Sequence, residues 1–124
     1  MKTLNWQYSI ALVFMVLMGS LHCTGQKTGL VNNEDFDIKI SSLLDFSIPI
    51  ISVKEAFSNK ENVIFLDARE EEEYSVSHIK DAIHIGYNDP QLTAVNDFPT
   101  DTPLILYCSV GYRSEKICKL LSEK

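Results

Sequence analysis

The chain has 124 residues, of which 45% are hydrophobic and 23% charged, and this length and composition predict a single globular domain. Its formal net charge of −6 argues against nucleic-acid binding, because proteins that bind phosphate backbones are usually basic. Its three cysteines are too few for a disulfide scaffold, and ligands at the close spacing of a zinc site are absent. We therefore expect no metal and no other cofactor.

The chain opens with a segment typical of an export signal. Lys2 gives a weakly basic start, and residues 10–18 (IALVFMVLM) form an unbroken apolar run. These nine residues are too few to span a bilayer, which takes about 20, but they match the apolar region of a signal peptide. A buried N-terminal helix is the alternative interpretation. We assign residues 1–22 to an export signal and expect the protein in the periplasm or cell envelope.

Cys23 stands where bacterial lipoprotein signals are cleaved and lipidated. The sequence GSLHC resembles such a site only in part. The residue before the cysteine is usually small, and here it is His22. Cleavage by the ordinary signal peptidase, for example after Gly25, is the alternative. Removing residues 1–22 from the 124 would leave 102, held at a membrane only through lipid on Cys23.

Residues 23–45 are predicted to link this signal to the fold, and residues 46–124 to form the domain. The stretch 25–37 (GQKTGLVNNEDFD) is polar and weakly patterned, as in a tether. The first element of the domain is a predicted helix at 53–57, with Ser52 as its N-cap and Glu55 completing a capping box.

Helical and strand-like segments then alternate along the chain. Three apolar stretches predict strands, at 63–66 (VIFL), 82–85 (AIHI) and 104–107 (LILY). Helical segments are predicted at 70–75, 91–98 and 114–121. This order predicts an α/β fold, a mainly parallel sheet flanked by helices on both faces. Such sheets bind ligands at the carboxyl ends of their strands, and Cys108 follows one of these ends.

The loop from Cys108 to Arg113 (CSVGYR) combines residue types that stabilise an anion. A helix N-terminus and inward-pointing backbone N–H groups favour the thiolate, the reactive form of cysteine. Gly111 permits the positive φ of a tight loop, and Arg113 can bind an oxyanion through two N–H groups. A buried cysteine ahead of a helix with a solvated arginine is the alternative interpretation.

Cys118 falls within the predicted last helix, beside Ile117 and Leu121. This setting is typical of a small core residue. A disulfide between Cys108 and Cys118 in an oxidising compartment is a second possibility.

The sequence resembles the single-domain rhodaneses, a family of sulfurtransferases. The loop matches the family pattern Cys-x-x-Gly-x-Arg-Ser at Cys108, Gly111, Arg113 and Ser114. The upstream segment FLDAREEEEYSVSHIKDAIHI matches a second family pattern at Asp67, Arg69, Glu73, Tyr74, His78, Ile79, Ala82 and Ile83. The resemblance extends from about residue 50 to the end of the chain.

The resemblance implies the rhodanese-like fold and a double displacement at Cys108. Cys108 would take a sulfur from a small donor, such as thiosulfate or a persulfide, and become a persulfide itself. A thiol or cyanide would then accept that sulfur. The loop residues implied to bind the donor sulfur are Ser109, Val110, Gly111, Tyr112 and Arg113.

Four further matched residues are given supporting roles. Asp67 and Arg69 are interpreted as a tie between the strand end and neighbouring loops, and Arg69 as a source of positive potential. Glu73 is expected on a solvated acidic face from which it could approach the loop. His78, preceded by Ser77 where the family usually has glycine, is expected to fix a loop by a hydrogen bond, with general-base work as the alternative.

Rhodaneses continue beyond this last helix with another strand and helix. We therefore expect an incomplete domain that lacks both, with an unpaired edge on the strand at 104–107. A non-catalytic rhodanese-like binding module is one alternative function. A phosphatase or arsenate reductase is another, but its loop has five residues between cysteine and arginine, whereas Cys108 and Arg113 enclose four.

Overall fold

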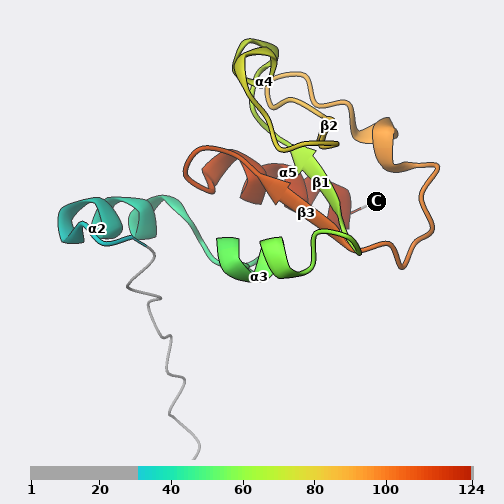
Figure 1. Cartoon of the computed structure of the whole chain (residues 1–124). Coiled ribbons are helices and arrows are strands. Elements are labelled where there is room, and N and C mark those ends of the chain that lie inside the picture. The colour runs from blue at the N-terminus through green and yellow to red at the C-terminus, as the bar shows by residue number, and fades with distance from the viewer. Residues whose placement is uncertain (1–30, 124) are drawn as a thin grey trace, which may run out of the picture.

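The computed structural model describes residues 31–123, so the assignments made for residues 1–22 and for Cys23 lie outside the described residues. The described part contains one sheet of three strands, β1 (Ile64–Asp67), β2 (Ile83–His84) and β3 (Leu104–Tyr107). Their order is β2-β1-β3, and both neighbouring pairs are parallel (Figure 1). Parallel neighbours need crossover connections, which run through α4 (Glu71–Val76) and the 3₁₀ helix η1 (Leu92–Val95).

Helices flank this small sheet. The helix α5 (Tyr112–Ser122) packs beside β3, and α3 (Val53–Ser58) precedes β1. Figure 1 shows α3 and α4 at opposite ends of β1, because that strand runs from one to the other. The predicted class, an α/β fold with a parallel sheet flanked by helices, is confirmed.

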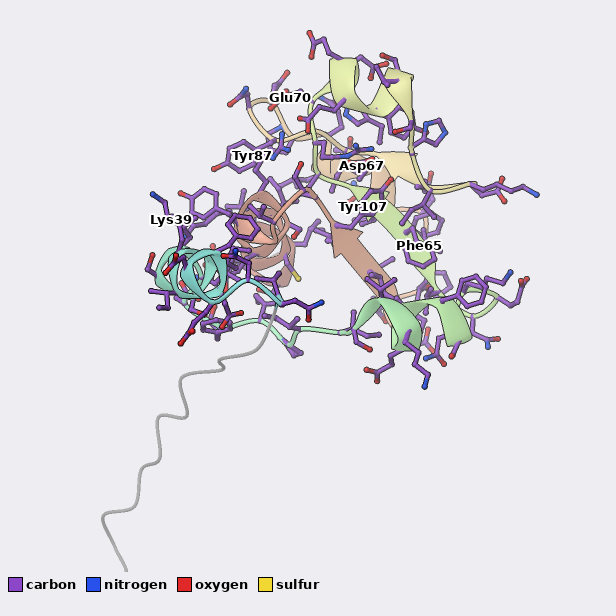
Figure 2. All side chains as sticks on the ribbon, turned by 60° about the vertical axis from the view of Figure 1, so that its left-hand side comes forward. Lys39, Phe65, Asp67, Glu70, Tyr87 and Tyr107 are labelled. Atoms are coloured by element: carbon purple, nitrogen blue, oxygen red, sulfur yellow. The ribbon has the colours of Figure 1, made fainter. Side chains whose placement is uncertain are left out.

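The core lies between the sheet and α5. It centres on four buried side chains, Leu66, Ala68, Ile85 and Ile117. Alternation along β1 points Ile64 and Leu66 into this core and turns Phe65 and Asp67 to the opposite face of the sheet (Figure 2). The strand extends to Asp67, one residue further than its apolar pattern predicts, because Asp67 still pairs with His84 and Tyr107.

Several element boundaries differ from the sequence prediction. The N-cap of α3 is as predicted, since Ser52 Oγ accepts the Glu55 N–H at 3.2 Å. The helix predicted at 91–98 is the single 3₁₀ turn η1. The last helix begins at Tyr112 instead of residue 114. Within the described residues β3 pairs with β1 alone and forms one edge of the sheet, as expected.

Part of the segment predicted as a linker is helical. The helix α2 spans Glu34–Leu43, and the Asn33 side chain caps it by accepting the Phe36 N–H at 2.8 Å. Three acidic residues in its first turn stabilise the helix, because their negative charges lie at the positive end of the helix dipole. Its apolar residues do not gather on one face, since Ile38 is exposed while Ile40 is buried. The sequence therefore lacks the apolar periodicity from which this helix could have been predicted.

The chain that follows α2 is attached to α5. The backbone N–H groups of Asp45 and Phe46 donate to the Glu115 carboxylate at 3.3 and 2.9 Å. Asp45 also pairs with Lys119. Glu115 is buried, so these bonds satisfy a charge that would otherwise be costly to desolvate. Residues 44–46 therefore belong to the folded unit. No helix within residues 31–123 is long and apolar enough to span a bilayer.

Candidate active site

Cys108 lies directly after β3, in the short loop that leads into α5. Its Sγ accepts the Gly111 N–H at 3.2 Å. The Ser114 hydroxyl lies 3.6 Å from the same sulfur and 3.0 Å from the Gly111 carbonyl oxygen. Gly111 has φ of 92°, a conformation that favours glycine, and it caps the helix. The loop thus folds back over the sulfur it carries.

These contacts favour the thiolate of Cys108. Burial by itself raises the pKa of the thiol, but hydrogen bonds from Ser114 and from the Val110 and Gly111 backbone outweigh it and hold the pKa below its ordinary value. Cys118 differs, because burial raises the pKa of its thiol. Both cysteines are free, so the disulfide considered between them is not formed in this structure.

Arg113 is paired with Glu73 of α4. Its Nη1 donates to Glu73 Oε2 at 2.5 Å and its Nη2 to Oε1 at 2.9 Å. The same Nη2 donates to Ser109 Oγ at 3.0 Å, and that hydroxyl donates to Glu73 at 3.3 Å. Hydrogen bonding from Arg113 lowers the pKa of Glu73 to about 2. The acidic helix and the cysteine loop are therefore joined by an ion pair.

A second ion pair, between Asp67 and Arg69, lies at the end of β1. Arg69 Nη2 donates to Asp67 Oδ2 at 2.6 Å and to the Ser77 carbonyl oxygen at 2.7 Å. Burial opposes ionisation of Asp67, but hydrogen bonds from Arg69 and Tyr107 outweigh it and hold its pKa below the usual range. Figure 2 shows Asp67 and Tyr107 near one another at the strand ends, where the Tyr107 hydroxyl accepts the Ile79 N–H at 3.1 Å.

An open pocket of about 280 Å³ lies beside Cys108. Its lining residues come from the strand ends and from the segment after α4: Arg69, Ser77, His78, Ile79, Tyr107, Cys108 and Ser109. The imidazole of His78 is exposed, donates from Nδ1 to the Tyr74 carbonyl at 2.9 Å and stacks on the Tyr74 ring at 3.9 Å.

The other predicted loop residues do not line this pocket. Val110 is exposed, and the Tyr112 ring faces the Lys116 ammonium at 5.3 Å. Conversely, Tyr107, Ser77 and Ile79 line the pocket without having been predicted to do so. Two sequence features pointed to this region, the position of Tyr107 directly before Cys108 and the place of Ile79 in the matched family pattern. Within residues 31–123 no group of three or more His, Cys, Asp or Glu could hold a metal ion.

Comparison with known protein families adds an independent observation. The family described as Rhodanese-like domain matches residues 52–124, more than half of the chain. The chain belongs to this family. The match includes the whole sheet, both ion pairs and the cysteine loop of the rhodanese-like domain.

Two curated relatives share this region. The protein named "Putative sulfurtransferase YtwF" from Bacillus subtilis (strain 168) is 32% identical over 78 residues, which cover 62% of this chain and 74% of that protein. The "tRNA sulfurtransferase" of Thermoplasma volcanium is 33% identical over 66 residues, 53% of this chain but 13% of that protein. The chain thus spans a small part of the archaeal relative. No solved structure gave a significant match.

Proposed function

We propose that this rhodanese-like domain is a sulfurtransferase that carries a sulfane sulfur as a persulfide on Cys108. The observation that carries the proposal is the setting of the Cys108 sulfur, which accepts the Gly111 N–H at 3.2 Å at the start of α5. A thiolate and a persulfide anion need the same stabilisation. The printed names of both relatives support the same class of reaction.

The proposed reaction is a double displacement. The Cys108 thiolate attacks the outer sulfur of a small donor, and the bond between that sulfur and the rest of the donor breaks. The electron pair leaves with the donor, as sulfite from thiosulfate or as a thiolate from a persulfide. In the second step an acceptor thiolate or cyanide attacks the sulfur carried by Cys108, and the electron pair returns to Cys108. No oxidant or reductant is consumed.

Two rival functions have less support. Four residues separate Cys108 from Arg113, one fewer than in the phosphatase and arsenate reductase loops, and Arg113 is engaged by Glu73. A non-catalytic binding module would have no need of a thiol whose pKa is lowered by hydrogen bonds. A free Cys108 in a hydrogen-bonded loop beside an open pocket therefore favours catalysis.

Mass spectrometry tests the proposal directly. Incubation with thiosulfate or cysteine persulfide should add about 32 Da, one sulfur atom, and cyanide should remove it. Cys118→Ser should retain the adduct, because the pKa of that thiol is raised by burial. Cys108→Ser should abolish it. Two outcomes would contradict the proposal and favour the non-catalytic binding module. One is an adduct that is lost in Cys118→Ser; the other is a folded protein with free thiols that takes sulfur from neither donor.

A further inference from the structure

Both arginines of the chain lie at the cysteine loop, and both are neutralised. The sequence contains two arginines, Arg69 and Arg113. Arg69 is matched by the buried carboxylate of Asp67 at 2.6 Å. Arg113 is matched by Glu73 through two hydrogen bonds of 2.5 and 2.9 Å. Neither guanidinium therefore offers an uncompensated charge to a donor.

Among the described residues, those that line the pocket add no compensating positive charge. Arg69 is the one Lys or Arg among its lining residues, and the lining His78 already donates to a carbonyl oxygen. The helix that supplies Glu73 carries three acidic residues in its first turn. The Gly111 N–H is directed at the Cys108 sulfur. A dianion that contacts these lining residues would therefore meet no uncompensated cation.

We infer that Glu73 is a specificity-determining residue that, by neutralising Arg113, suits this site to organic persulfide donors and disfavours dianionic thiosulfate. The inference rests on the proposed sulfurtransferase function. An organic persulfide is neutral or singly charged at its sulfurs, and its carbon portion can contact the apolar lining residues Tyr107 and Ile79.

The step balances without a further reactant. The Cys108 thiolate attacks the outer sulfur of R–S–SH, and the bond between the two donor sulfurs breaks. The electron pair leaves on R–S⁻, and the outer sulfur keeps its proton, which gives Cys108–S–SH. The leaving thiolate carries one negative charge. Sulfite, the leaving group from thiosulfate, would carry two, and the neutralised site has no free cation to stabilise them.

Single-turnover sulfur loading on the full chain tests the inference. The rate constants for cysteine persulfide and thiosulfate are each divided by the rate constant of that donor with free cysteine, which removes the intrinsic reactivity of the donor. The wild type should favour cysteine persulfide by roughly tenfold or more on this scale. Glu73→Gln keeps the shape of the side chain but frees the Arg113 charge, and should raise the thiosulfate value roughly tenfold with little change for the persulfide.

Glu72→Gln is the matched control. Glu72 is exposed on the same helix, so its substitution removes the same charge without freeing Arg113 and should leave both values near wild type. Equal or faster normalised loading from thiosulfate in the wild type would overturn the inference, as would a folded Glu73→Gln with an unchanged donor ratio. If that variant fails to fold, the wild-type ratio alone decides. Loading from neither donor would instead overturn the sulfurtransferase proposal on which the inference rests.

Discussion

At the scale of single residues, the chemistry depends on what surrounds one sulfur atom. The sequence places Cys108, Gly111 and Ser114 close along the chain, and the structure brings their polar atoms within 3.6 Å of one another. Ser114 is buried, and it was recognised in the sequence only as part of a motif. Its backbone N–H, and after it its hydroxyl, oppose the effect of burial on the pKa of Cys108.

Ser114→Ala should therefore raise the pKa of Cys108. The substitution removes a hydrogen bond to the thiolate and leaves the burial of the sulfur in place. At neutral pH less thiolate is present, so alkylation by iodoacetamide should be several-fold slower, and its pH profile should shift to higher pH. The measurement is made with Cys23 and Cys118 both replaced by serine, so that Cys108 is the one thiol left to react with iodoacetamide.

Ser122→Ala, at the far end of the same helix, is the matched control for that substitution. The Ser122 hydroxyl donates to the Lys119 carbonyl at 2.8 Å, remote from the sulfur, and its loss should leave the alkylation profile unchanged. A wild-type profile in folded Ser114→Ala would assign Ser114 a purely structural role.

The two ion pairs show what residue patterns can and cannot predict. From the sequence, Asp67 and Arg69 are interpreted as a tie between the strand end and neighbouring loops. In the structure they pair with each other, and Arg69 also donates to the Ser77 carbonyl oxygen. Glu73 lies 40 residues from Arg113 and is the last of four successive glutamates. Nothing in that run distinguishes the glutamate that reaches Arg113, because the choice depends on how α4 sits over the loop.

At the scale of elements, the loop between β3 and α5 depends on one backbone conformation. Gly111 adopts φ of 92°, which lets α5 start at Tyr112 and directs the Gly111 N–H at the sulfur. A glycine in the loop indicated this turn. The early start of the helix was not predictable, because its N-cap Gly111 has no side chain that could mark the boundary by a capping hydrogen bond.

Gly111→Ala should destabilise the fold. An added Cβ would lie 3.5 Å from Leu44 Cδ1, an ordinary contact, so the cost comes from the positive φ and should be about 1–2 kcal/mol. Urea unfolding measures this change. Sulfur loading should also slow, since any relaxation of φ moves the N–H away from the Cys108 sulfur.

Val110→Ala is the comparison for Gly111→Ala. Val110 is exposed, and its truncation should change the free energy of unfolding by less than about 0.5 kcal/mol. A Gly111→Ala protein as stable as the wild type would mean that the loop can reach its conformation without glycine.

At the scale of the whole molecule, the folded unit is larger than the family match. The match begins at residue 52, yet Asp45 and Phe46 are bonded to the buried Glu115 of α5. The sequence predicts a linker over residues 23–45, because the stretch 25–37 is polar and weakly patterned. The attachment depends on a carboxylate 69 residues from Phe46, which local patterns do not detect.

Export and lipidation form a proposal for the complete chain. The apolar run at 10–18 is followed by Cys23, and both lie outside the described residues. In a bacterial host the mature protein should lack residues 1–22, carry lipid on Cys23 and partition with membranes, since acyl chains bind bilayers through their buried CH₂ groups. Intact-mass measurement of membrane and soluble fractions decides this, with Cys23→Ser as the control that should lose the lipid. An unmodified full-length chain in the cytosol would contradict export, whereas a soluble form that begins at another residue would contradict lipidation alone.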